Sequence, residues 1–185
     1  MVRLEQLLES GANPNNYTCA CEVPLSFAAS KCSESALRQL IVAGAKTTNT
    51  WAELALRNSI QARCSTEVIS VLLDGGVDPN ASYYLGDTVL MDAVRQNNLA
   101  VARLLLQRGA DPNRVARWEG HVMATIGETT PLILAANLDS VEMVALLLEF
   151  GAQPGMKDVF GYSARRMALE KGYLDVASLL PEELP

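Results

Sequence analysis

Leu105-Leu106-Gln107-Arg108-Gly109-Ala110-Asp111-Pro112-Asn113 has a pattern that recurs along the chain and indicates its architecture. An apolar helix end is followed each time by a glycine and a small residue, with the turn glycines at Gly11, Gly44, Gly76, Gly109 and Gly151. The spacings are 33, 32, 33 and 42 residues. Glycine in this place adopts the left-handed conformation that closes a helix, and a proline just beyond cannot continue it. The period predicts a row of similar helical units.

A second motif precedes most of these helices, in Val23–Ala29, Thr88–Val94, Thr130–Ala136 and, more weakly, Ser163–Leu169. Threonine or serine caps a helix start, and proline fits the first helical position because no amide donor is needed there. The paired small residues that follow let one helix lie close to its neighbours. Hydrophobic residues make up 49% of the chain and aromatic residues only 5%, which also favours closely packed helices. Each unit is predicted to hold two short antiparallel helices and a projecting turn or hairpin.

These linked motifs resemble the ankyrin repeat, whose signature is Thr-Pro-Leu-His-x-Ala-Ala followed by Gly-Ala-Asp-x-Asn. Thr130 to Ala136 with Gly151-Ala152 matches well, except that Ile133 replaces histidine. The resemblance covers essentially the whole chain and implies an all-α ankyrin-repeat solenoid of stacked antiparallel helix pairs with projecting β-hairpin loops. About five repeats are expected, the first of them incomplete. The Trp, Tyr and Pro pattern of tetratricopeptide repeats is absent.

The repeat register predicts one domain over residues 1–185, with a partial repeat 1–15, repeats 16–48, 49–80, 81–113 and 114–155, and a C-terminal capping repeat 156–185. The chain begins inside a second helix, which fits a truncated unit, a capping unit or the edge of a longer protein. The prolines and acidic residues after Leu180 should end the last helix and give the polar surface that a terminal cap needs.

Two repeats depart from the pattern. After Gly44 the next helix-forming stretch begins at Thr50, so we expect the projecting hairpin to be missing and the link between helices, residues 59–65, to be longer than usual. Trp51 is interpreted as filling the space left by the hairpin. Between Asn113 and Thr130, by contrast, about nine extra residues lengthen a hairpin insert, residues 114–129. Its Trp118 either contacts a partner or folds back on its own repeat, and the sequence leaves both open.

Charge and cysteine content restrict the partners and the compartment. The 15 basic and 21 acidic residues give a net charge of −6, which repels a phosphate backbone, so nucleic acid is not an expected partner. No apolar run reaches the length of a membrane span, and no membrane insertion is expected. The chain alone is predicted to be monomeric. Its four cysteines are too few for a secreted disulfide scaffold, which predicts free thiols and a reducing, intracellular location, the cytoplasm or the nucleus.

The sequence offers little for catalysis. The single histidine, His121, excludes His-x-x-x-His zinc sites, and neither a phosphate-binding glycine loop nor a Gly-x-Ser-x-Gly turn is present. Cys19, Cys21 and Cys32 form a zinc site only with a fourth ligand, and Cys64 is one repeat away. We therefore interpret the cysteines as small filler residues. No catalytic residue, metal or cofactor is predicted, and the chain is not expected to be an enzyme.

The resemblance implies that a partner protein binds along the hairpin tips and the exposed positions of each first helix. Carried over by register, the expected partner-binding residues are Tyr83, Tyr84, Leu85, Asp87, Arg95, Gln96, Arg117, Trp118, His121, Met123, Asn137, Phe160 and Tyr162. Aromatic side chains and arginine are enriched among the residues that dominate binding, so Trp118→Ala or Tyr84→Ala should weaken binding by about 2 kcal/mol and leave folding intact. The predicted function is non-catalytic protein binding. The alternative is an inhibitor or immunity-type protein that neutralises a partner enzyme.

Overall fold

The computed structural model describes residues 4–16, 23–82, 86–115 and 129–182. The chain divides into two compact units, Met1–Ala81 and Ser82–Pro185. The helices of unit 1 are α1 (Leu4–Glu9), α2 (Pro24–Ser30), α3 (Glu34–Val42), α4 (Thr50–Gln61) and α5 (Thr66–Asp74). Those of unit 2 are α6 (Val89–Arg95), α7 (Leu99–Gln107), α8 (Pro131–Asn137), α9 (Val141–Glu149), α10 (Ala164–Lys171) and α11 (Leu174–Leu179).

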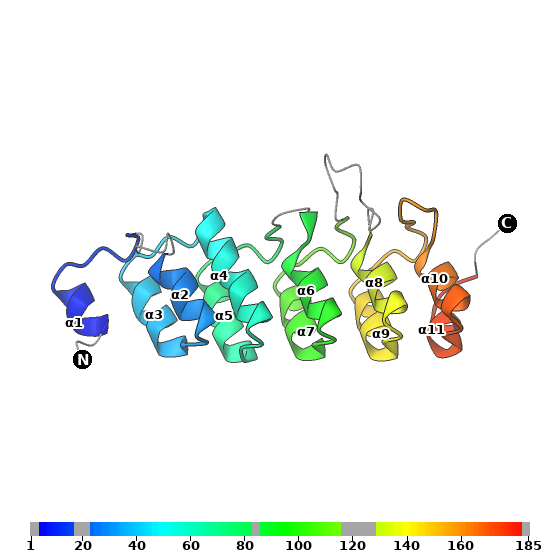
Figure 1. Cartoon of the computed structure of the whole chain (residues 1–185), viewed down its shortest axis with the longest axis horizontal. Coiled ribbons are helices and arrows are strands. Elements are labelled where there is room, and N and C mark those ends of the chain that lie inside the picture. The colour runs from blue at the N-terminus through cyan, green and yellow to red at the C-terminus, as the bar shows by residue number, and fades with distance from the viewer. Residues whose placement is uncertain (1–3, 17–22, 83–85, 116–128, 183–185) are drawn as a thin grey trace. The chain divides into compact units, whose positions relative to one another are not determined.

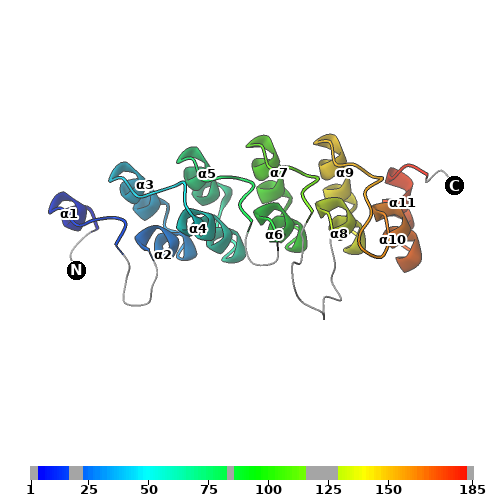
Figure 2. The same ribbon diagram turned by 90° about the horizontal axis from the view of Figure 1, so that it is seen from above.

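Helix pairs stack in two layers within each unit. In unit 1, α2 packs against α4 and α3 against α5. In unit 2, α8 lies between α6 and α10, and α9 lies between α7 and α11 (Figures 1 and 2). The described part of the chain contains no β-sheet, only isolated β-bridges such as Ser82 to Thr88. The predicted all-α fold of stacked antiparallel helix pairs is confirmed.

The repeated motif residues fix both ends of the helices as the sequence predicts. The hydroxyls of Thr88, Thr130 and Ser163 each accept a hydrogen bond from the backbone amide three residues ahead, at 3.1–3.3 Å. The turn glycines have left-handed φ angles from 85° at Gly151 to 92° at Gly76, a conformation that a β-carbon would strain. Alanines at the paired small positions, such as Ala135 and Ala136, are completely buried between neighbouring helices.

Hairpin loops precede α6 and α10 in unit 2. Antiparallel bridges join Ser82 to Thr88 and Lys157 to Ser163. In the second hairpin, Oδ1 of Asp158 accepts hydrogen bonds from the backbone amides of Phe160 at 2.9 Å and Tyr162 at 2.8 Å. One carboxylate therefore holds the turn in a single shape.

Helix α4 confirms one prediction about the irregular second repeat and corrects another. It begins at Thr50, so only residues 45–49 follow Gly44 and the projecting hairpin is missing, as predicted. The predicted long link over residues 59–65 is wrong, because α4 continues through 12 residues to Gln61. Ser59 is tolerated there because its hydroxyl donates to the carbonyl of Leu56 at 2.7 Å, within the helix. The other first helices have seven or eight residues, so the missing hairpin is replaced mainly by extra helix at the start of α4.

A disulfide joins Cys32 to Cys64, with a Cα–Cα distance of 5.2 Å. The prediction of free thiols is therefore wrong for this pair. The reason is the stacking itself: the two residues are 32 positions apart, about one repeat, so the turns between helices of consecutive repeats bring them together. Cys19 and Cys21 lie outside the described residues. The cysteines therefore no longer support a reducing compartment, and the intracellular location stays a prediction. Among the helices that the structure describes, none has the length and apolar character needed to cross a bilayer.

Candidate functional site

The first candidate site is the exposed edge of unit 2. It consists of the hairpin loops and the exposed faces of the first helix of each repeat. Asp87 directly precedes the N-cap of α6, and Arg95 is the last residue of that helix. The guanidinium of Arg95 reaches back along α6, with Nη2 2.8 Å from Oδ1 of Asp87 and Nη1 3.4 Å from Oδ1 of Asp92. The structure therefore brings the two predicted residues Asp87 and Arg95 together. Asp92, which sequence reasoning missed, completes the cluster.

Tyr162 occupies in the last repeat the position that Asp87 occupies in the third repeat of the register, directly before the N-cap. It also contacts an arginine of the helix that follows, since the guanidinium of Arg166 lies 4.2 Å from the ring centroid. Nε of Arg166 is 3.8 Å from Oε1 of Glu170 one turn later. Phe160, at the tip of the same hairpin, has 60% of its surface exposed. The exposed Phe160 ring is thus on the same hairpin as Tyr162. The Tyr162 ring, the Arg166 guanidinium and the Glu170 carboxylate follow one another along the start of α10.

The remaining described candidates lie at the ends of first helices. Gln96 follows the last turn of α6, and its backbone amide donates to the carbonyl of Asp92 at 3.1 Å. Asn137 is the half-buried last residue of α8, and its backbone carbonyl accepts from Nζ of Lys171 at 3.4 Å. Seven candidates fall outside the described residues and stay predictions: Tyr83, Tyr84, Leu85, Arg117, Trp118, His121 and Met123.

Asn113 links the turns of adjacent repeats. Its Nδ2 donates to the carbonyl of Gly151 at 3.0 Å, and its Oδ1 accepts from the amide of Gln153 at 2.7 Å. Asn15 makes the same pair of contacts in unit 1, to the carbonyl of Gly44 at 3.0 Å and the amide of Lys46 at 2.8 Å. In both units one asparagine side chain therefore sets where the next loop begins.

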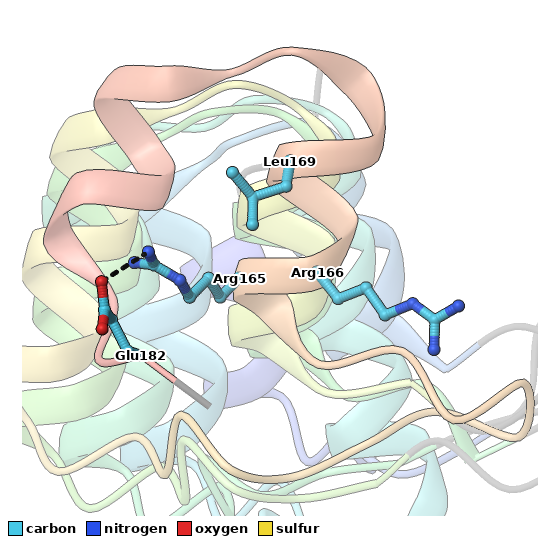
Figure 3. Close-up of a pocket in the computed structure, with 4 residues that line it drawn as sticks. All are labelled: Arg165, Arg166, Leu169 and Glu182. Carbon is cyan, nitrogen blue, oxygen red and sulfur yellow. Dashed lines mark ion pairs between the residues drawn. The ribbon is translucent and has the colours of Figure 1, made fainter. Parts of the chain in front are cut away.

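A cavity of about 330 Å³ opens at the C-terminal end of unit 2, lined by Arg165, Arg166, Leu169 and Glu182. Nη1 of Arg165 donates to the carbonyls of Ala177 at 2.6 Å and Leu180 at 2.7 Å, and Nη2 lies 3.7 Å from Oε1 of Glu182. Figure 3 shows Arg165 directed toward Glu182, and Arg166 directed away from it. The positive guanidinium of Arg165 satisfies backbone carbonyls at the end of α11. It also interacts favourably with the negative end of the α11 helix dipole.

Arg165 was missed by sequence reasoning, although a signal existed. It stands where α2, α6 and α8 have Leu25, Leu90 and Leu132, each of them buried. Replacement of the core leucine by arginine indicates that this face is polar. We therefore assign Arg165 to the closure of the last helix pair.

Two further observations concern the titratable groups of the described residues. Within the described ranges, no three His, Cys, Asp or Glu side chains lie close enough to hold a metal ion. On α5 of unit 1, a hydrogen bond from the Ser65 hydroxyl is the main cause that lowers the pKa of Glu67 below its usual 4.5.

Family models locate the repeats independently. A model of ankyrin repeats in three copies matches residues 25–116, and a model of a single ankyrin repeat matches residues 128–159. The chain is an ankyrin-repeat protein. Ankyrin repeats generally mediate binding to other proteins and are usually non-catalytic.

Relatives of this ankyrin-repeat protein have diverse names. Cyclin-dependent kinase 4 inhibitor B of Homo sapiens is 31% identical over 122 residues, 66% of this chain and 82% of that protein. Glycerophosphocholine phosphodiesterase of Schizosaccharomyces pombe is 26% identical over 178 residues, 91% of this chain but 15% of that protein. A putative ankyrin repeat-containing protein of Treponema pallidum is 38% identical over 81 residues, 44% of this chain and 24% of that protein. The chain thus spans a quarter or less of the last two relatives.

Proposed function

We propose that this ankyrin-repeat protein is a non-catalytic binding module that holds a partner protein on the exposed edge of unit 2. We call this surface the unit 2 edge and define its described members as Asp87, Arg95, Asn137, Phe160 and Tyr162. The predicted residues 83–85 and the insert residues Arg117, Trp118, His121 and Met123 belong to the same proposed surface by register.

The exposure of Phe160 is the observation that most supports this proposal. A phenylalanine ring with 60% of its surface in water gains free energy when a partner covers it. The carboxylate of Asp158 already fixes the backbone of this hairpin, so little conformational entropy is lost on binding. The neighbouring pair of Tyr162 and Arg166 adds two residue types that are enriched in binding hot spots.

Affinity capture from the native lysate with a matched pair of variants tests the proposal. Phe160→Ala should reduce the recovered partner by about tenfold or more, because hot-spot truncation costs about 2 kcal/mol. Leu174→Ala is the control, since Leu174 is 69% exposed but begins the second helix α11. A chain that lacks residues 114–128 tests the insert in the same experiment. Equal recovery with Phe160→Ala and Leu174→Ala would contradict a site on the unit 2 edge.

A second candidate function is direct inhibition of an enzyme, as for an immunity protein or an enzyme inhibitor. It is favoured by the relatives named as inhibitors of cyclin-dependent kinase 4, of which this chain covers 82–84%. Addition of the purified chain to cyclin-dependent kinase 4 with its cyclin should then lower phosphate transfer to substrate, and Phe160→Ala should lower it less. Unchanged kinase activity at saturating chain removes this kinase as a target and leaves the binding role to the capture experiment.

A further inference from the structure

A cleft in unit 1, which we call the Trp51 cleft, lies beside the short loop that stands in place of a hairpin in the second repeat. It has a volume of about 160 Å³, and its lining includes Asn15, Val23, Leu25, Lys46, Asn49 and Trp51. Trp51 lies in the first turn of α4, in the stretch of helix that replaces the hairpin, and is half-buried. The cleft thus includes part of the irregular repeat, and the described residues that line it belong to one compact unit.

Hydrogen bonds fix the polar side of the Trp51 cleft. Asn15 uses both ends of its amide, one to the carbonyl of Gly44 and one to the backbone amide of Lys46. Oδ1 of Asn49 accepts from the amide of Ala52 at 3.0 Å and starts α4. The apolar side is provided by Val23 and Leu25, which are both buried. The cleft is thus preformed, which lowers the entropic cost of filling it.

The described lining of the Trp51 cleft carries one positive charge in an acidic chain. Lys46 is the one ionisable residue among the described residues that line the cleft, and its side chain is exposed. Within the part of the chain that the structure describes, no ion pair is recorded for the Lys46 ammonium. Glu53, the acidic residue nearest along α4, is not part of the lining. A carboxylate is therefore the group whose charge is complementary to the Lys46 ammonium. A cleft with a positive group is unusual on a chain whose net charge is −6.

We propose that the Trp51 cleft receives a glutamate side chain from an extended segment of the partner protein. The cleft, at about 160 Å³, has room for one side chain of this size. The methylene groups of the glutamate would contact Trp51 and Val23, and the carboxylate would pair with the ammonium of Lys46. The cleft lies beside the loops of unit 1, as the unit 2 edge lies beside the loops of unit 2. This proposal extends the proposed binding function to unit 1, but it rests on different residues and is tested separately.

Nuclear magnetic resonance titration of the full chain tests the cleft with a defined probe. The probe is N-acetyl-L-glutamate N′-methylamide, and its matched control is the glutamine analogue, which has the same shape without the charge. The backbone amide of Lys46 and the indole NH of Trp51 report on the cleft; Trp118→Phe identifies the second indole signal. The glutamate probe should shift both signals in a saturable way and bind about fivefold more tightly than the glutamine probe, as one exposed ion pair allows.

Variants of Lys46 separate the charge from the fold. Lys46→Gln should remove the preference for glutamate, and Lys46→Arg should retain it, while both keep the backbone amide that Asn15 holds. The spectrum of each variant shows whether the chain remains folded. Equal binding of the two probes, or a glutamate preference that survives Lys46→Gln, overturns the proposal. Phe160→Ala should leave this titration unchanged, so failure here is distinct from failure of the unit 2 edge.

Discussion

The two units use different chemistry at the same place in the repeat. In each, the residue in the left-handed turn between helices meets the residue that follows the equivalent turn of the next repeat. In unit 1 these residues are Cys32 and Cys64, joined by a covalent bond. In unit 2 they are Asn97 and Ser140, whose hydroxyl lies 2.6 Å from Oδ1 of Asn97. The position is a general contact point between repeats, and the side chains there decide how strong the contact is.

On the loop side of the repeat, each unit contains the same pair of anchoring hydrogen bonds, but the loops that follow these bonds differ. Asn15 and Asn113 make the same two hydrogen bonds to the following loop. The chain then forms a hairpin before α10 in unit 2, but extra helix at the start of α4 in unit 1. Anchoring contacts are thus independent of the structure that follows them, which explains how an irregular repeat fits without loss of register.

The disulfide should give the largest difference between the units. Cys32→Ser combined with Cys64→Ser should lower the free energy of unfolding by about 3–4 kcal/mol, because the unfolded chain is no longer closed into a loop. Urea denaturation with and without a phosphine reductant measures the effect. Reductant should destabilise the natural chain and leave the double variant unchanged. An identical midpoint for the natural chain in both conditions would contradict the covalent contact.

Replacement of the bridging asparagines tests whether the matched contacts are equally strong. Asn113→Ala should cost about 2 kcal/mol, since two hydrogen bonds to the next loop are lost. Asn15→Ala should cost about half as much, because Asn15 follows the short α1, a helix with no buried residue. Urea denaturation of both variants gives the two values. A larger loss for Asn15→Ala would reverse our ranking of these two contacts.

The hydrogen-bonded turn of unit 2 should show a smaller effect than the disulfide. Ser140→Ala removes the bond to Asn97 and should lower the free energy of unfolding by about 1 kcal/mol. Hydrogen exchange of the amides in α7 and α9 should rise in the variant and show where the loss acts. If Ser140→Ala matches the loss in the double cysteine variant, the two contacts do not differ as we infer.

The smallest expected effect concerns pH in unit 1. The hydrogen bond from Ser65 lowers the pKa of Glu67 in the folded chain, so the stabilisation is fully present above its unfolded value near 4.5 and is lost as pH falls through the lower folded value. Glu67→Gln should therefore be less stable than the natural chain at neutral pH, and the difference should shrink in acid. Thermal unfolding across this pH range measures it, with Ser65→Ala as a second variant that should behave alike.

Local chemistry made much of the fold predictable. A glycine after an apolar helix, a capping Thr or Ser, and paired alanines each act on nearby residues, so Gly109, Thr130 and Ala135 have the roles that their motifs predicted. The extension of α4 to Gln61 was not predicted, because Ser59 reads as a loop residue until its hydroxyl is seen to bond within the helix. Helix propensity alone does not show that the hydroxyl of Ser59 finds a hydrogen-bond partner within the helix.

The candidate site was less predictable because its contacts join separate positions. Register placed Asp87 and Arg95 on one face, but the reach of Arg95 along α6 depends on rotamers. Cys32 and Cys64 were each interpreted as an isolated filler residue, although their spacing of about one repeat predicts contact between consecutive turns. Arg165 in a leucine position was likewise a readable signal. Tyr84 and Trp118 lie outside the described residues, so the sequence prediction for them stands as it was made.

The covalent link between Cys32 and Cys64 has a consequence for how the chain responds to tension. If the two ends are pulled apart, force passes through the sulfur atoms and bypasses the residues between them. A separation of 32 positions corresponds to about 110 Å of extended chain that stays hidden from the pull. Helices α3 and α4 should therefore lie outside the load path, and a stretched molecule in its oxidised form should be shorter than its reduced form by that length.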